Sequence, residues 1–101
     1  MDKNIKRILI KIAAILEEGE EKYYSELVNN VLTGNQDGLL DFLVSNELWG
    51  GAGSIADQAL LDKKYLREKL EKLLVELGEI QVRINKVNTR TTMWLEAFCK
   101  Q

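Results

Sequence analysis

The chain has 101 residues, a net charge of −2, one cysteine, and neither proline nor histidine. This length suffices for one domain and is too short for two, so we expect residues 1–101 to form a single domain. Without histidine the chain lacks the commonest general base and metal ligand, and the lone Cys99 excludes an internal disulfide. We therefore expect no enzyme activity, no cofactor and no metal.

The charge is distributed unevenly along the chain. Residues 17–62 hold ten acidic residues and a single base, Lys22, a net charge of −9, whereas the preceding segment carries +3 and the following one +4. A protein that binds nucleic acid needs a basic surface, so we expect no direct contact with nucleic acid. The acidic segment favours a basic protein partner, and an acidic surface that only aids solubility accounts for the charge equally well.

The first three expected elements are helices. Apolar residues recur at three- and four-residue intervals over residues 5–16, behind the capping residue Asp2, which predicts an amphipathic helix ending near Gly19. A second helix is expected over Tyr23–Thr33 and a short third one over Gln36–Ser45. No apolar run approaches the length of a membrane span or a signal-peptide core, so we expect a cytoplasmic protein without membrane contact.

A glycine-rich stretch interrupts the helical pattern between residues 46 and 54. Its motif residues, which we expect to act structurally, are Gly50, Gly51, Gly53, Ser54 and Asp57. The serine and the aspartate three positions later are typical of a helix N-terminus and predict a brief helix through Leu61. The stretch lacks the Gly-Lys-Ser/Thr ending of a phosphate-binding loop, so we favour a tight turn that lets the backbone pack closely under Trp49. Second to that, an exposed Trp49 would anchor an interface, and third, the loop would bind a small ligand.

The last third is one long amphipathic run. From Leu66 to Phe98 apolar residues alternate four- and three-residue steps, which is typical of a helix that packs against other helices. Gly78 and residues 88–92 have poor helix propensity, so we expect a kink or break near residues 86–91. Arg90 in this break could pair with an acid of the middle segment and fasten the terminal helix to the glycine loop. The chain is thus predicted to be an all-α, single-domain bundle of about five helices with one long C-terminal helix.

The stretch Leu48-Trp49-Gly50-Gly51-Ala52-Gly53-Ser54-Ile55-Ala56-Asp57 resembles a motif in a family of small bacterial proteins. In that family Trp-Gly-Gly-x-Gly-Ser-x-x-Asp precedes a long helix, and the tail from Arg90 to Phe98 is loosely similar as well. Its members look like the immunity proteins of toxin–immunity systems, including those of contact-dependent growth inhibition. The resemblance implies that the chain neutralises a cognate toxin, often a nuclease, inside the cell that carries it.

An acidic surface can occlude the basic active site of a nuclease by mimicking the charge of phosphates. We therefore expect a monomer that binds a basic protein toxin. The alternative is a structural or adaptor module that dimerises through its long helix. The residues expected to contact the partner are Glu17, Glu18, Glu20, Glu21, Asp37, Asp41, Glu47 and Trp49.

Overall fold

The computed structural model describes residues 3–100, and six α-helices occur among them. They are α1 (Lys3–Glu18), α2 (Lys22–Thr33), α3 (Gln36–Leu43), α4 (Ile55–Gln58), α5 (Lys64–Arg83) and α6 (Thr91–Cys99). No strand occurs within residues 3–100, so the predicted all-α bundle is confirmed. Asp2, the predicted cap of α1, lies outside the described residues.

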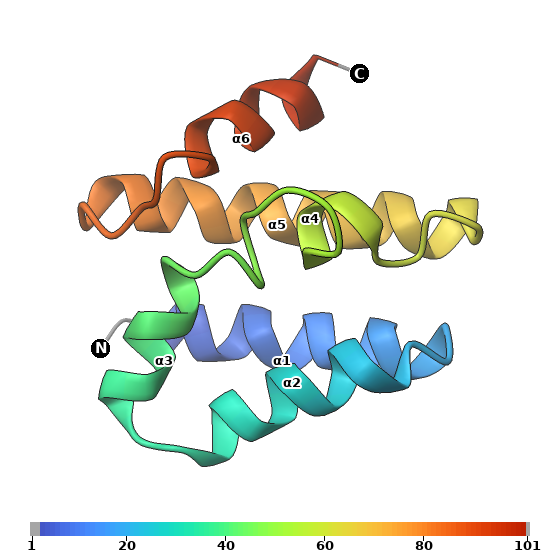
Figure 1. The fold of residues 1–101 in the computed structure, drawn as a ribbon, viewed down its shortest axis with the longest axis horizontal. Helices are drawn as coiled ribbons and strands as arrows, with labels where there is room; N and C mark the ends of the chain where they lie inside the picture. The colour runs from blue at the N-terminus through green and yellow to red at the C-terminus, as the bar shows by residue number, and fades with distance from the viewer. Residues whose placement is uncertain (1–2, 101) are drawn as a thin grey trace.

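The two longest helices, α1 and α5, run antiparallel and form the centre of the bundle (Figure 1). Helix α2 packs along α1, and α3 follows it at the far end of α2. The segment that carries α4 crosses in front of α5, and α6 lies against α5 on the side away from α1 (Figure 1). Each outer helix therefore covers one part of the central pair.

The predicted apolar face of the first helix forms one wall of the core. Ile5, Ile8, Leu9, Ile12 and Leu16 are each at most 1% exposed. Their spacing places them on one side of α1, and burying each side chain contributes roughly 1.5–3 kcal/mol. The periodicity alone therefore identified this wall correctly.

The predicted apolar seam of the last third is only partly correct. Leu70, Leu74 and Leu77 are fully buried, whereas Leu73, a predicted seam residue, is half-buried and Ile84 is 40% exposed. A straight α-helix has 3.6 residues per turn, so a seam with a repeat of 3.5 drifts sideways along it. Within α5 the fully buried residue is accordingly Leu74 and not the predicted Leu73.

The expected break in the C-terminal run is confirmed, since α5 ends at Arg83 and α6 begins at Thr91. Gly78, which we expected to weaken the long helix, instead lies where α6 crosses α5. A Cβ atom at this position would come within 2.5 Å of the Cδ2 atom of Leu95. The glycine therefore lets α6 approach α5 closely.

Candidate functional site

Trp49, which opens the glycine motif, is fully buried, with 0% of its surface exposed. Its indole Nε1 donates to Oε1 of Gln81 on α5 at 2.8 Å, which satisfies the polar end of the ring. Gly50 lies so close to the carbonyl of Asn46 that no Cβ atom would fit there. The predicted tight turn around Trp49 is therefore confirmed, and the prediction that Trp49 is exposed to a partner is wrong.

The glycine loop is bonded to itself. The Ser54 hydroxyl accepts from the amide of Asp57 and donates to the carbonyl of Gly50, both at 3.1 Å. The amides of Ile55 and Ala56 donate to carbonyls of the turn that precedes the loop. The predicted N-cap of α4 is thus confirmed, although the helix ends at Gln58 and not at Leu61. Because the N–H groups that open α4 already have protein acceptors, the loop does not offer them to a phosphate.

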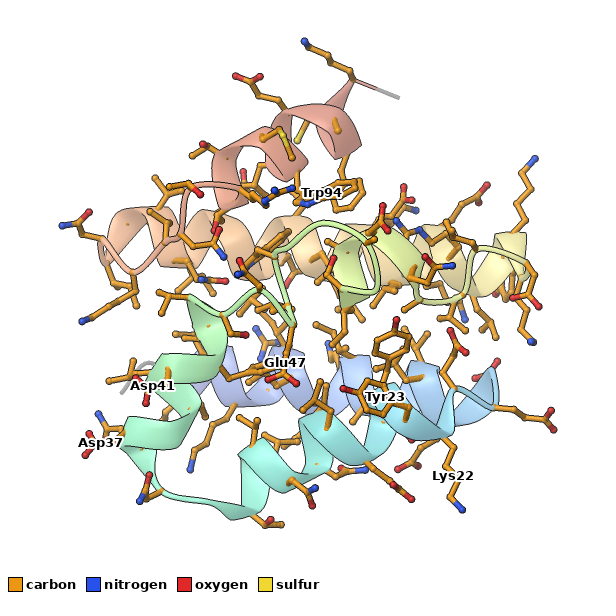
Figure 2. All side chains as sticks on the ribbon, viewed as in Figure 1. Lys22, Tyr23, Asp37, Asp41, Glu47 and Trp94 are labelled. Carbon is orange, nitrogen blue, oxygen red and sulfur yellow. The ribbon has the colours of Figure 1, made fainter. Side chains whose placement is uncertain are left out.

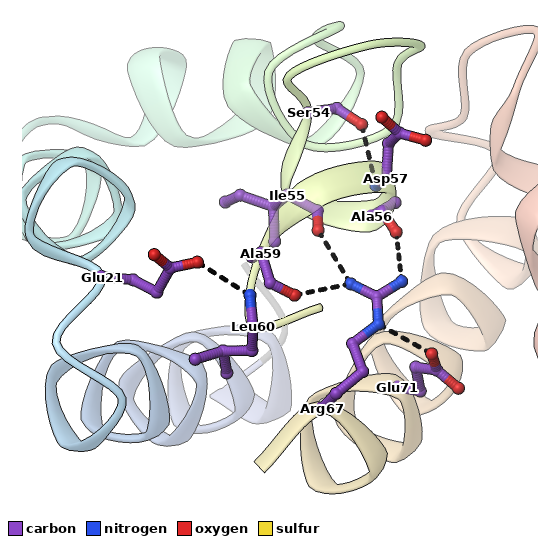
Figure 3. A network of polar contacts seen from close by, with 9 residues as sticks. All are labelled: Glu21, Ser54, Ile55, Ala56, Asp57, Ala59, Leu60, Arg67 and Glu71. Carbon is purple, nitrogen blue, oxygen red and sulfur yellow. Dashed lines mark hydrogen bonds and ion pairs between the residues drawn. The ribbon is translucent and has the colours of Figure 1, made fainter. Parts of the chain in front are cut away.

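A buried arginine holds the other end of α4 (Figure 3). The guanidinium of Arg67 on α5 donates to the carbonyl oxygens of Ile55, Ala56 and Ala59, while its Nε pairs with Glu71 at 2.7 Å. Arg67 is only 8% exposed, and a buried charge is tolerated when it is paired and fully hydrogen-bonded. The sequence offered no sign of this role, because Arg67 reads as one of many charged residues on a long helix.

Glu21 has an internal role and does not simply face solvent. Its Oε2 accepts from the backbone amide of Leu60 at 2.7 Å (Figure 3). Leu60 has a φ angle of +61°, which is unfavourable for a bulky side chain, and the carboxylate helps to hold it there. Glu21, predicted as a partner contact, is therefore half-buried and engaged within the fold.

Asn88, in the break between α5 and α6, joins three segments of the chain. Its Nδ2 donates to the carbonyl oxygens of Val44, Ser45 and Trp49 at 2.9–3.2 Å. Its Oδ1 accepts from the amides of Arg90 and Thr91 at 2.8 and 3.0 Å and so caps the start of α6. The poor helix propensity of this stretch predicted the break, but it gave no sign that one side chain would organise it.

Two further contacts attach α6 to the glycine loop. The indole Nε1 of Trp94 donates to the carbonyl of Gly50 at 2.9 Å. The guanidinium of Arg90 lies over Gly51, where an added Cβ atom would come within 3.1 Å of Nη1. Arg90 thus meets the glycine loop as expected, but no ion pair to an acid accompanies it within residues 3–100.

The predicted acidic contacts fall into two groups. Glu17 and Glu18 end α1, and Glu20 lies in the turn that follows it. Asp37 and Asp41 lie on α3, and Glu47 lies in the turn after it (Figure 2). All six are exposed. Helix α2 separates the two groups by about 18 Å, since an α-helix rises 1.5 Å per residue.

The exposed side of α2 bridges the two acidic groups. Tyr23 is 66% exposed, and Glu26 one turn later is exposed as well. The rings of Tyr23 and Tyr24 pack edge to face, with centroids 5.3 Å apart. This contact supports the Tyr23 ring, most of which remains exposed to solvent. Two adjacent tyrosines on a helix indicate that one of them faces outward, but only the structure identifies it as Tyr23.

Within residues 3–100, none of these acids forms an ion pair. The ion pairs formed among residues 3–100 are Lys63–Asp62 and Arg67–Glu71, and neither involves the two acidic groups. In the same part of the chain, no cluster of three or more cysteine or carboxylate side chains is placed to hold a metal ion. None of the helices there is both long and apolar enough to cross a bilayer.

Comparison with known proteins gives no match to a family model, a curated protein or a solved structure.

Proposed function

We propose that this protein is an immunity protein that neutralises a basic protein toxin, such as a nuclease, by binding it stoichiometrically. The proposed contact region, called the acidic surface below, consists of Glu17, Glu18, Glu20, Tyr23, Glu26, Asp37, Asp41 and Glu47. The observation that carries the proposal is that these seven carboxylates are exposed and have no ion-pair partner within residues 3–100.

The acidic surface has the extent of a protein interface. A standard interface buries about 800 Å² on each partner, a patch roughly 30 Å across. The about 18 Å of α2 between the two acidic groups fits within such a patch. One partner could therefore contact both groups, with the exposed Tyr23 ring at the start of α2 as an aromatic anchor of the type that dominates interface energetics.

Exposed carboxylates suit the capture of a basic active site. A nuclease needs positive charge to hold phosphates, and carboxylates can occupy the same positions. Long-range attraction between opposite charges also raises the rate of association, and this effect weakens as salt screens it. Fast capture is what an inhibitor of an intracellular toxin requires.

The alternative function, a module that dimerises through its long helix, depended on an unoccupied apolar seam. Leu66, Leu70, Leu77 and Ile80, which are residues of that predicted seam on α5, belong to the chain's own core. The residues on which a dimer would have depended therefore already contribute to the folding of the single chain.

The test uses the toxic product of an adjacent gene, expressed with and without this protein. The first variant reverses three charges on one side of the acidic surface, Asp37→Lys, Asp41→Lys and Glu47→Lys. At about 1 kcal/mol for each reversed interface charge, the complex should weaken roughly a hundredfold, and cell survival should fall. Binding is measured by calorimetry at low and high salt, and the wild-type affinity should fall with salt.

A matched control reverses three exposed acids elsewhere, Glu68→Lys, Glu79→Lys and Glu96→Lys. It changes the net charge by the same amount and should leave protection intact. An equal loss of protection in both variants would show that the effect comes from net charge and not from the acidic surface. Full protection by the first variant would show that the acidic surface does not bind the toxin.

A further inference from the structure

A second surface of opposite charge lies between the two central helices. A shallow furrow of about 390 Å³ is lined only by residues of α1 and α5. We call it the lysine furrow, and its lining residues are Lys11, Ala14, Ile15, Lys69, Lys72 and Leu73. It shares no residue with the acidic surface, so it concerns a separate site.

The lysine furrow has an apolar floor between two positively charged rims. Ala14 is exposed, and Ile15 and Leu73 are half-buried, although both pack against the core. Lys11 stands on the α1 rim, and Lys69 and Lys72 stand on the α5 rim.

None of the three lysines forms an ion pair within residues 3–100, although the pKa of Lys69 is raised, chiefly by its hydrogen bond with Tyr65 and to a smaller extent by the nearby Glu18 carboxylate. All three are exposed. Lys69 is held over the ring of Tyr65, with its Nζ atom 4.5 Å from the centroid, and so retains its charge for an external group. Apolar contact, one lysine on the α1 rim and two on the α5 rim are therefore available to one ligand at the same time.

We propose that the lysine furrow docks an amphipathic α-helix of a partner protein, with an apolar stripe that has carboxylates along both of its sides. A helix laid into the furrow would pack its stripe on Ala14, Ile15 and Leu73, in the manner of helix-in-groove recognition. Its carboxylates would then meet the lysines on both rims. The proposal does not depend on toxin binding and can fail or succeed independently of it.

The shape and the neighbouring charges favour a helix over a membrane. A furrow between two helices accepts a convex rod, whereas a bilayer surface is flat on this scale. Exposed acids flank the lysines on the same helices, Glu18 on α1 and Glu68 and Glu76 on α5. These acids would repel an anionic lipid surface, whereas a helix can place its carboxylates against the three lysines on the rims and away from the flanking acids.

The probe is a synthetic peptide of about 15 residues, long enough for four helical turns, with a leucine stripe flanked by glutamates. It is titrated into the ¹⁵N-labelled full chain, and backbone amide shifts are followed by NMR. We expect saturable shifts on α1 and α5 around the lysine furrow. A scrambled peptide of the same composition, which has no apolar stripe, should bind at least about tenfold more weakly.

Two variants test the site, each with its own control. Lys11→Glu, Lys69→Glu and Lys72→Glu together should weaken peptide binding about tenfold or more. The same change at the exposed Lys6, Lys64 and Lys100 should have less than about a threefold effect.

The second variant, Ala14→Trp, fills the furrow without changing charge and should abolish the shifts. Ala97→Trp, at an exposed position on α6, should leave them unchanged. Circular dichroism checks that every variant stays folded. The proposal is overturned if the shifts lie elsewhere or do not saturate, or if the scrambled peptide binds as well. Lysine-dependent binding to vesicles of phosphatidylcholine and phosphatidylserine, without peptide binding, would assign the furrow to a membrane surface instead.

Discussion

Replacing Asn88 with alanine tests whether one side chain holds the junction between α5, α6 and the glycine loop. The two Nδ2 hydrogens serve three carbonyl oxygens, those of Val44, Ser45 and Trp49, so one hydrogen is shared. Oδ1 accepts from two backbone amides at the start of α6. The substitution removes all of these side-chain bonds, whereas the carbonyl of Ser45 still accepts from the amide of Trp49 and the amide of Thr91 still donates to the carbonyl of residue 88.

The expected loss of stability follows from these bonds. The contacts to the carbonyls contribute about 1 kcal/mol for each of the two hydrogens. The cap on α6 adds about 1 kcal/mol. Asn88→Ala should therefore destabilise the chain by about 3 kcal/mol, a large share of the 5–15 kcal/mol typical of a small domain. For a chain of this length, Tm should fall by more than about 10 °C.

Urea unfolding followed by far-UV circular dichroism measures the effect, with Thr89→Ala as the control. Thr89 is an exposed residue of the same segment, so its truncation should change stability by less than about 0.5 kcal/mol. The slope of the free energy of unfolding against urea should be unchanged in Asn88→Ala, since the surface exposed on unfolding stays the same. Equal stability of the two variants would refute the role assigned to Asn88.

Three further substitutions probe other contacts. Gln81→Leu leaves the buried indole N–H of Trp49 without its acceptor and should cost about 3 kcal/mol in urea unfolding; a loss below about 1 kcal/mol would contradict that role. Gly78→Ala would gain about 1 kcal/mol of helix propensity but drives a methyl group into Leu95, so we expect a net loss of about 1 kcal/mol and weaker packing of α6. A more stable Gly78→Ala protein would show that α6 can move aside freely. The pKa of Tyr24 is raised above its ordinary value of 10.0, chiefly by burial and next by the Glu21 carboxylate, so the folded state keeps the phenol protonated to higher pH than the unfolded state. This contribution to stability is complete below about pH 10 and is lost as pH rises through the folded pKa, so the wild type should lose more stability above pH 10 than Tyr24→Phe; parallel pH profiles would refute it.

The resemblance to immunity proteins rests on the glycine motif, and in this fold the motif is structural. Trp49 is buried, Ser54 caps α4, and Gly50 and Gly51 allow close contacts with the backbone and with Arg90. A structural motif of this kind indicates how the chain folds and does not indicate which surface binds a partner. The proposed toxin contact therefore involves the acidic surface and not the motif residues themselves.

Local features of the chain were predictable from the sequence alone. The apolar period over residues 5–16 identified the buried face of α1, and the weak helix propensity of residues 88–92 identified the break before α6. The Ser54 cap was predictable for the same reason. Each of these features depends on residues that are close to one another in the sequence, so a local sequence pattern is enough to predict it.

The tertiary structure decided the partners of the polar and aromatic side chains. The sequence favours a packed Trp49 over an exposed anchor, but only the structure shows that Gln81, 32 positions later, accepts its N–H. Asn88 meets carbonyl groups 39–44 positions earlier, and Glu21 meets an amide 39 positions later. The chain order likewise groups the acids into one segment, and only the direction of α2 separates them into two groups on the surface. Contacts at such separations depend on how the helices pack, and a one-dimensional pattern of hydrophobicity and charge does not specify that packing.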